Sequence, residues 1–335
     1  MEEIQMIKYL ALLLFPTLAF AGFHPTSENE CTPIDLRNNE INYVRNQKEI
    51  AWCYAFTAAD MLGHTFKTGE KISAADVALN YNETGVGRFA RWLDRTVINR
   101  NDQNSRNEAH QTGFNKIALN QAMKEGHCPE RIFPSEAWTQ LTRVGDSWEK
   151  KVVSLQVAMH AIKALHENRT TLTAENLPYY FSFKNITPQN FVELIQTKRL
   201  VNFYNSLRLL ACKDDRKEFD HRWKVKMVFR NKNIFWRVGE QLGLGRIVGL
   251  DYDSRILVNR EQRGVSLARL HTSAIVGRRW HKESQTCQLL VRDSYGDQCA
   301  KYDPTYDCEG GKVWLRESQL YPNLTSIVYM LSRVN

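Results

Sequence analysis

Apolar residues recur every three or four positions along the first part of the chain, which is the spacing of an amphipathic helix. The pattern predicts three helices, over residues 53–62, 74–80 and 117–125. Ser73 is suited to cap the second helix, and Gly126 is suited to end the third. We therefore expect residues 22–134 to form a mainly helical lobe.

The helical spacing continues through residues 135–230. An apolar stripe runs through residues 152–162, from Val152 to Ile162. Thr187 followed by Pro188 is a typical start for a further helix, which would carry the apolar residues up to Leu200. We interpret residues 135–230 as a mostly helical insertion whose stripes pack into a core.

The period of the pattern changes to two after Arg222. Apolar and basic residues alternate from Trp223 to Phe229, as in a strand with one buried face. Further short apolar runs occupy residues 247–250, 274–276, 289–291 and 327–330. Residues 231–335 are therefore expected to form a strand-rich lobe, and the whole chain is expected to have an α+β fold.

The chain opens with an apolar run over residues 9–20 that is followed by Ala21 in an Ala-Phe-Ala sequence. This is the pattern of a secretory signal peptide, residues 1–21, and the run is too short to span a bilayer. No later stretch approaches the length of a transmembrane helix. We expect a soluble chain that is secreted or periplasmic.

The chain contains seven cysteines, and an odd number in an oxidising compartment leaves one thiol unpaired. If Cys53 is the free one, the other six can form three disulfides, but the sequence does not choose among the pairings. A zinc site is the competing use of these residues, although no Cys-x-x-Cys occurs.

The net charge of +8 is moderate, and much of it lies in residues 213–237, where nine Lys or Arg accompany four Asp or Glu. Such a segment can bind an acidic partner or an anionic envelope, or it can be an ordinary solvated face. No nucleic-acid-binding motif accompanies it, so we expect no nucleic-acid partner.

Cys53 has the surroundings of a nucleophile. Unpaired backbone N–H groups at the start of a helix favour a thiolate. Gln47 precedes Cys53 by six residues, so its amide can assist the Cys53 N–H in stabilising an oxyanion. The alternative is a buried cysteine that happens to begin a helix.

A thiol nucleophile needs a base and a group that orients the base. His271 enters the apolar strand over residues 274–276, and Asp293 and Tyr295 follow the strand over residues 289–291. Asp293 can accept from the His271 ring, and Tyr295 can cover that bond. A structural histidine and a turn aspartate are the alternatives.

Three blocks together resemble the papain-like cysteine peptidases. They are Gln47 with Cys53, His271 with Gly277, and residues 292–296, which stand where the family has Lys-Asn-Ser-Trp-Gly. The similarity covers roughly two-thirds of the exported chain, and residues 135–230 lie outside it. The resemblance implies a two-lobe fold with a helical lobe, an antiparallel barrel-like lobe and a cleft between them.

The chain departs from the family pattern at two places. Residues 50–52 replace the usual Cys-Gly-Ser before the nucleophile, so Trp52 is expected to narrow the cleft and contact substrate, together with Tyr295. The orienting Asn is Asp293, whose charge is expected to raise the pKa of His271 and to favour a thiolate–imidazolium pair.

The resemblance implies peptide-bond hydrolysis by Cys53, His271 and Asp293 with Gln47 as oxyanion donor. The substrate would be a peptide or protein, and no cofactor or metal is required. The alternatives are a catalytically inactive papain-like binding protein and a transglutaminase-like acyl transferase. A metal pair formed by Asp251 and Asp253 is a further idea, beside which an ordinary pair of acids at a strand end is the simpler interpretation.

Overall fold

The structure is a computed structural model, and it describes residues 27–37, 43–93, 113–220 and 222–332. The predicted signal peptide, residues 1–21, lies outside these ranges. No helix among the described residues combines the length and the apolar character that are needed to cross a membrane.

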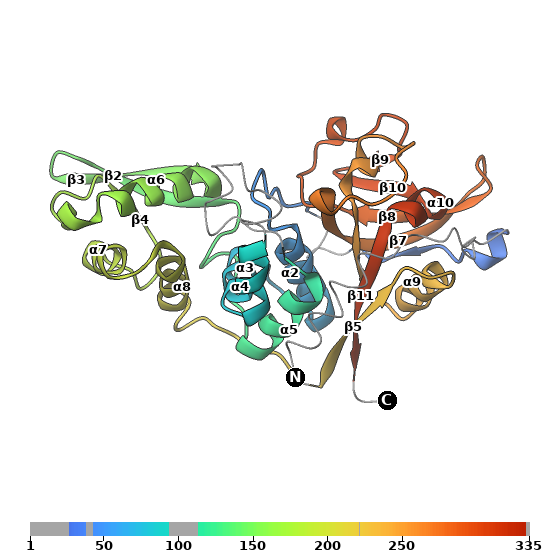
Figure 1. The fold of residues 1–335 in the computed structure, drawn as a ribbon, viewed down its shortest axis with the longest axis horizontal. Helices are drawn as coiled ribbons and strands as arrows, with labels where there is room; N and C mark the ends of the chain where they lie inside the picture. The colour runs from blue at the N-terminus through green and yellow to red at the C-terminus, as the bar shows by residue number, and fades with distance from the viewer. Residues whose placement is uncertain (1–26, 38–42, 94–112, 221, 333–335) are drawn as a thin grey trace.

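The first part of the molecule is helical, as predicted. Its helices are α2 (Cys53–Phe66), α3 (Ala74–Asn82), α4 (Gly85–Leu93) and α5 (Asn115–Glu125). The Ser73 hydroxyl accepts from the backbone N–H of Asp76 at 2.9 Å, which caps α3. Helices α2, α3 and α5 pack against one another in the middle of the molecule (Figure 1).

The segment over residues 135–230 is only partly helical, which corrects the prediction. It holds α6 (Leu155–Glu167), α7 (Pro188–Thr197) and α8 (Leu200–Ala211). It also holds a three-stranded antiparallel sheet of β2 (Ala137–Val144), β3 (Ser147–Ser154) and β4 (Tyr179–Phe181), in the order β3-β2-β4. These elements gather at the opposite end of the molecule from the large sheet (Figure 1).

Two details explain the difference. Val152 belongs to β3 and is 78% exposed, so the buried stripe of α6 begins at Leu155. The predicted second helix is two helices, because α7 ends at Thr197 and α8 begins at Leu200. The Thr187 hydroxyl does cap α7, by accepting from the Asn190 backbone N–H at 3.1 Å.

An antiparallel sheet of eight strands is built from a short strand near the start of the described chain, from the end of the 135–230 segment and from the residues that follow it. These are β1 (Ile34–Asp35), β5 (Trp223–Phe229), β6 (Val248–Asp253), β7 (Leu270–His281), β8 (Thr286–Arg292), β9 (Cys308–Glu309), β10 (Lys312–Arg316) and β11 (Leu324–Ser332). The order is β5-β11-β6-β7-β8-β10-β9, and β1 pairs with β7. The predicted α+β class is confirmed.

The large sheet is buried on both faces. On β7, Ala274 and Val276 join the core formed with the helical part, while Ile275 joins a second core. The second core is closed by α9 (Ile234–Gly243) and the short α10 (Glu317–Leu320). Alternate side chains of β7 therefore point to opposite faces of the sheet, and α2 packs against one of these faces.

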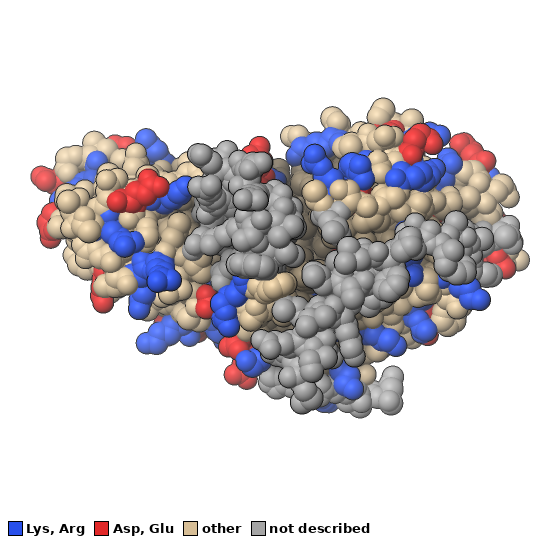
Figure 2. Space-filling model, viewed as in Figure 1, with Lys and Arg blue, Asp and Glu red and all other residues tan. Residues whose placement is uncertain are grey.

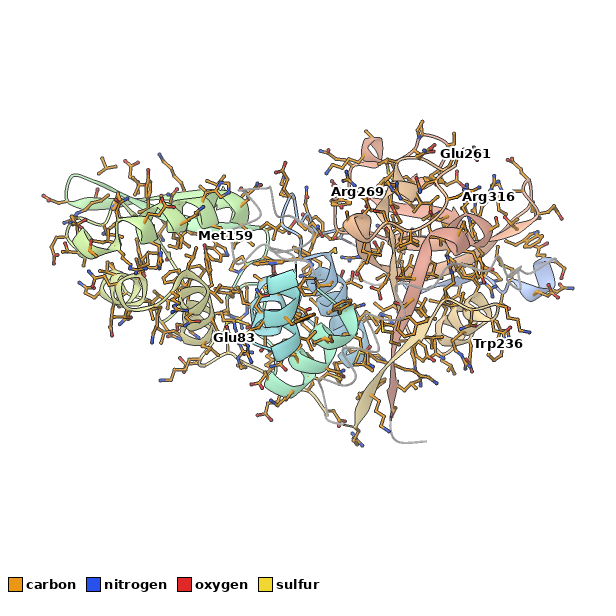
Figure 3. The ribbon with its side chains drawn as sticks, in the orientation of Figure 1. Glu83, Met159, Trp236, Glu261, Arg269 and Arg316 are labelled. Atoms are coloured by element: carbon orange, nitrogen blue, oxygen red, sulfur yellow. A yellow bond between two sulfur atoms is a disulfide. The ribbon has the colours of Figure 1, made fainter. Side chains whose placement is uncertain are left out.

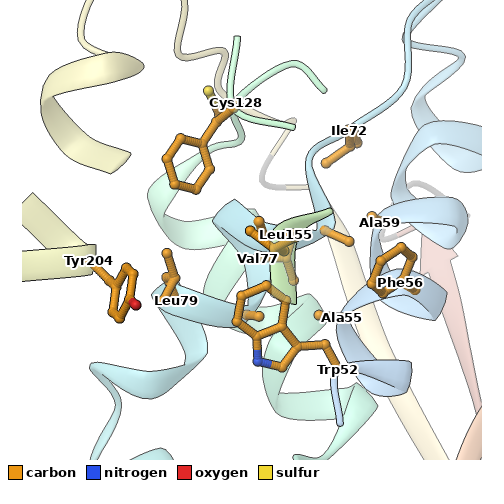
Figure 4. Packing of buried hydrophobic residues seen from close by; sticks show 14 of the residues in the cluster. Trp52, Ala55, Phe56, Ala59, Ile72, Val77, Leu79, Cys128, Leu155 and Tyr204 are labelled. Atoms are coloured by element: carbon orange, nitrogen blue, oxygen red, sulfur yellow. The ribbon is translucent and has the colours of Figure 1, made fainter. Parts of the chain in front are cut away.

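The first core is continuous from α2 to the outer end of the molecule. Figure 4 shows its centre, where Trp52, Val77, Leu155 and Tyr204 come from four different segments and pack together. Because one core joins α6 and α8 to α3, the segment over residues 135–230 is packed onto the helical part rather than attached by a linker.

The cysteines pair as the sequence analysis allowed. Cys53 is free, and the other six form disulfides Cys31–Cys287, Cys128–Cys212 and Cys299–Cys308. The competing zinc use is therefore wrong, because the six cysteines other than Cys53 are oxidised in pairs.

Candidate active site

Cys53 is the first residue of α2, and its side chain is 6% exposed. The preceding Trp52 carbonyl accepts from the N–H groups of Ala55 and Phe56, which starts the helical turn. The first N–H groups of a helix have no partner within the helix and carry the positive end of its dipole. The predicted position of Cys53 at a helix start is confirmed.

Gln47 is held beside the segment that follows β8. Its backbone N–H donates to the Ser294 carbonyl at 2.8 Å, and the Ser294 hydroxyl donates to its Oε1 at 2.5 Å. Because the amide oxygen is engaged, the NH2 end of Gln47 is the end that remains for another group. Gln47 is 5% exposed.

His271 and Asp293 form a buried pair. Nε2 of His271 lies 2.5 Å from Oδ1 of Asp293, and the two residues are 4% and 1% exposed. His271 is the second residue of β7, and Asp293 directly follows β8, its neighbour in the sheet. With Nε2 bound to the carboxylate, Nδ1 is the nitrogen left for exchange with another group.

Tyr295 covers this pair, as the sequence suggested. Its ring is stacked on His271 with a centroid separation of 4.9 Å and an angle of 14° between the planes. Its hydroxyl lies 3.5 Å from Nδ1 of His271. Tyr295 is partly exposed, so it shields the His271–Asp293 bond from water while reaching the surface.

Asp293 is surrounded by hydroxyl groups that the sequence analysis missed. The Ser273 hydroxyl donates to Oδ1 of Asp293 at 3.1 Å, and the Tyr252 hydroxyl lies 3.0 Å from that of Ser273. The Tyr302 hydroxyl lies 3.5 Å from Oδ2 and 3.2 Å from the Gly311 carbonyl. Ser273 could have been found, since it lies two residues after His271 on the same strand.

The electrostatics of the pair favour a charged imidazole. Burial alone would lower the pKa of His271, but the negative charge of Asp293, the nearby Cys53 and the hydrogen bond to Asp293 raise it well above its usual value. Burial and the charge of Asp293 also raise the pKa of Tyr302, so its phenol stays protonated at neutral pH.

Trp52 does not lie where a substrate contact needs it. It is 1% exposed and packs in the core between α3 and α6. An indole in that position fills core volume, so we do not retain Trp52 as a substrate-contacting residue.

A buried ionic cluster joins the two halves of the site. Asp60 on α2 accepts from Arg45 at 2.7 Å and from Arg292 at the end of β8. Arg292 also donates to the Tyr43 carbonyl at 2.7 Å. The cluster therefore fastens the helix that carries Cys53 to the strand that precedes Asp293.

The other predicted ligands and surfaces are engaged by the protein itself. Asp251 accepts from the hydroxyls of Thr272 at 2.8 Å and Ser326 at 2.7 Å, as expected of an ordinary acid at a strand. In the basic segment over residues 213–237, Arg216 pairs with Asp76 and Lys217 pairs with Glu70. The exposed lysines of this segment are Lys213, Lys217, Lys224, Lys226 and Lys232, of which Lys224 and Lys226 lie on β5.

The chain is similar in structure to several solved proteins. The Carica candamarcensis cysteine protease CMS1MS2, solved in complex with E-64, matches at 13% identity with a TM-score of 0.45, over 90% of this chain and 98% of that chain. The Amb a 11 cysteine protease, a major ragweed pollen allergen solved in its proform, matches at 14% identity with a TM-score of 0.42, over 91% and 70%.

PepW from Lactobacillus rhamnosis matches at 12% identity with a TM-score of 0.42, over 91% of this chain and 84% of that chain. No protein-family model and no curated protein sequence matches the chain. Two of these three similar structures are named as cysteine proteases, the class that the sequence motifs resemble.

Proposed function

We propose that this protein is a cysteine peptidase that hydrolyses peptide bonds with Cys53 as nucleophile. The observation that carries the proposal is the buried His271–Asp293 pair, whose imidazole is affected by the charge of Cys53. A thiol at a helix start next to an imidazole that a carboxylate orients is the arrangement that acyl transfer requires.

The reaction follows from this arrangement. The Cys53 thiolate attacks the peptide carbonyl carbon, and the Cys53 N–H and the Gln47 amide donate to the oxyanion that forms. Nδ1 of the His271 imidazolium gives its proton to the leaving amine, and the carbon–nitrogen bond breaks to leave a thioester on Cys53. Asp293 keeps Nε2 protonated throughout.

Water then completes the cycle. His271, now neutral, removes a proton from a water molecule, which attacks the thioester carbonyl. The carbon–sulfur bond breaks, the acid product leaves, and the proton on His271 restores the thiolate–imidazolium pair. We include export from the cell in the proposal, supported by the predicted signal peptide and by the three disulfides.

The test is labelling of the folded protein with a peptidyl epoxide that alkylates activated thiols, followed by peptide mapping. We expect stoichiometric labelling at Cys53, slowed at least about 100-fold in His271→Ala. His160→Ala, an exposed histidine on α6, is the matched control and is expected to react at the normal rate. Peptide cleavage by the unlabelled enzyme would complete the support.

Two other outcomes would change the assignment. Because Cys53 is only 6% exposed, a folded sample with no labelling would identify a closed site and favour an inactive binding protein. Labelling at Cys53 with transfer of the acyl group to an added amine, in preference to water, would identify a transglutaminase-like acyl transferase.

A further inference from the structure

A second site of polar side chains lies in the strand-rich part, apart from the candidate active site. A cavity of about 160 Å³ is lined by residues from the end of β7, from β8, β10 and α10, and from the segments around Arg260 and Thr305. Figure 3 labels Arg316, which ends β10 at this cavity. The cavity contains none of the residues of the proposed peptidase mechanism.

The amide oxygens of the two lining glutamines, Gln288 and Gln319, are already taken as acceptors. Oε1 of Gln288 accepts from Nε of Arg279 at 2.8 Å, and Oε1 of Gln319 accepts from the Arg316 backbone N–H at 3.2 Å. Both amides therefore have their NH2 groups left to donate. Gln288 and Gln319 are buried, so these orientations are fixed by the surrounding protein.

His281 likewise has one ring nitrogen occupied as an acceptor. Its Nδ1 accepts from the Ser284 backbone N–H at 3.3 Å and lies 2.8 Å from the Ser284 hydroxyl. An imidazole that accepts at Nδ1 carries its proton on Nε2. His281 thus adds a third uncharged N–H donor to the lining.

The charged groups add two cations. Arg316 makes no ion pair with any acid of the described part of the chain, and Arg260 uses one guanidinium nitrogen for Glu261 at 3.0 Å. Of the two lining acids, Asp307 is bound by Arg279, whose guanidinium is held over the Trp314 ring at 4.2 Å. Glu283 is the exception, and it lies exposed in the turn after β7.

We propose that this cavity is a binding site for a small oxyanion, such as sulfate, phosphate or a carboxylate group. The donors that remain are two guanidinium groups, two amide NH2 groups and one imidazole N–H, and oxyanions are the ligands that offer only acceptors to such a set. The cavity has more room than a single ordered water needs. Figure 2 shows basic side chains interspersed with acidic ones over this end of the molecule.

The test is direct titration of the full chain with sodium sulfate, sodium phosphate and sodium acetate, followed by calorimetry at constant ionic strength set with chloride. We expect saturable binding of one anion per chain. The order of affinity indicates which kind of ligand the cavity binds. Tightest binding of sulfate or phosphate indicates an inorganic anion or a sulfated or phosphorylated group. Tightest binding of acetate indicates the carboxylate of a peptide or sugar acid.

Two variants decide whether the cavity is responsible. Gln288→Glu keeps an acceptor for Arg279 but replaces the NH2 donor by a negative oxygen, so binding should fall at least tenfold. Arg316→Gln should weaken binding at least fivefold, and Arg263→Gln, an exposed arginine outside the lining, should not change it.

The readout is separate from the peptidase proposal. Denaturant unfolding of each variant reports whether the protein is folded, so neither this control nor the anion titration depends on whether the Cys53 thiol is reactive. Absence of saturable binding for all three anions, or equal affinity in wild type, Gln288→Glu and Arg316→Gln, would overturn the assignment.

Discussion

Asp293 is the residue that most distinguishes this site, because it places a full negative charge where the resembled family has an amide. The charge is buried, and it is held by the Ser273 hydroxyl and the His271 ring. A buried carboxylate without hydrogen-bond donors would be strongly destabilised, so the Ser273 hydroxyl and the His271 ring stabilise Asp293 in this position. The consequence is an imidazole that stays protonated to higher pH.

Asp293→Asn is expected to lower the pKa of His271, because burial would then act without the opposing charge. The alkaline limb of the pH–rate profile, or of the labelling rate at Cys53, should move to lower pH. Asp297→Asn removes an exposed acid four residues later and should leave the limb in place. A limb that moves to higher pH in Asp293→Asn would contradict this account.

The raised pKa of His271 also makes the free energy of unfolding depend on pH. The folded pKa of His271 lies above its unfolded value of about 6.5, so the pair stabilises the fold fully below that pH. The stabilisation is lost as pH rises through the folded pKa. Chemical unfolding of wild type and His271→Ala across this range should show a difference that narrows toward high pH.

His127 acts in the opposite direction. It is 1% exposed, stacks on Phe219 at 4.4 Å, and neither ring nitrogen has a hydrogen-bond partner in the described structure. Burial lowers its pKa to about 4. Protonation therefore favours unfolding, and stability present above pH about 6.5 is lost as pH falls toward 4.

His127→Phe is expected to remove this dependence, which amounts to at most about 3 kcal/mol. The measurement is the free energy of unfolding at pH 7 and at pH 4.5 for both proteins. If the two proteins lose the same stability on acidification, His127 is not the group responsible.

At the scale of residues, the pattern correctly predicted that Cys53 begins a helix and that His271 pairs with Asp293, because each lies at the end of a strongly periodic element. It could not supply the hydroxyls around Asp293. Tyr302 reaches Asp293 from the loop closed by Cys299–Cys308, and no local pattern indicates where a loop returns. The prediction that Trp52 lines the cleft was wrong because its core partners come from α6, which lies about a hundred residues later in the sequence.

At the scale of elements, most helices and most strands of the large sheet were predictable, whereas α4, α9 and the small sheet were not. The β2–β3 hairpin pairs Val144 with Ser147, so its turn is Gly145-Asp146, with Gly145 at φ 62°. A Gly at the start of a two-residue turn is a known hairpin signal. β3 is mostly exposed and carries charged residues, so its sequence does not show the alternation of apolar and polar residues that indicates a half-buried strand.

Disulfide removal tests how the elements are held together. Cys128–Cys212 joins the segment after α5 to the end of α8 across 84 residues, whereas Cys299–Cys308 closes a loop of 9. Loop-closure entropy predicts a loss of about 4 kcal/mol for Cys128→Ala/Cys212→Ala, about 2 kcal/mol more than for Cys299→Ala/Cys308→Ala. Denaturant unfolding of both double variants measures the difference, and an equal loss would contradict the entropic account.

At the scale of the whole molecule, the Asp60 cluster determines how the helical part and the sheet meet. Asp60→Asn leaves Arg45 and Arg292 buried with one negative charge fewer between them. Removing one partner of a buried ionic cluster costs about 3–5 kcal/mol. We expect a loss of that size in unfolding free energy and slower labelling of Cys53.

The control for this variant is Asp146→Asn, which removes an exposed acid in the β2–β3 turn and should be neutral. A stable Asp60→Asn protein with an unchanged labelling rate would show that the cluster does not align the two halves of the site.

Only the family resemblance could predict how the helical part and the large sheet are arranged, because the pattern of apolar residues does not give the order of strands in a sheet. The alternation at residues 223–229 predicted β5, but nothing local indicates that its neighbour is the last strand of the chain. The same holds for β1, which pairs with β7 more than 240 residues away, at Ile34 and Arg278.

That strand order has a consequence for biosynthesis. β11, the last described strand, lies between β5 and β6, with Val328 opposite both Met227 and Gly249. While the chain is still being made, β5 has no partner in the large sheet and β6 has a bare edge, and both edges are open to pairing with another chain. A chain truncated before Leu324 would keep both edges exposed, so we expect such a truncation to aggregate.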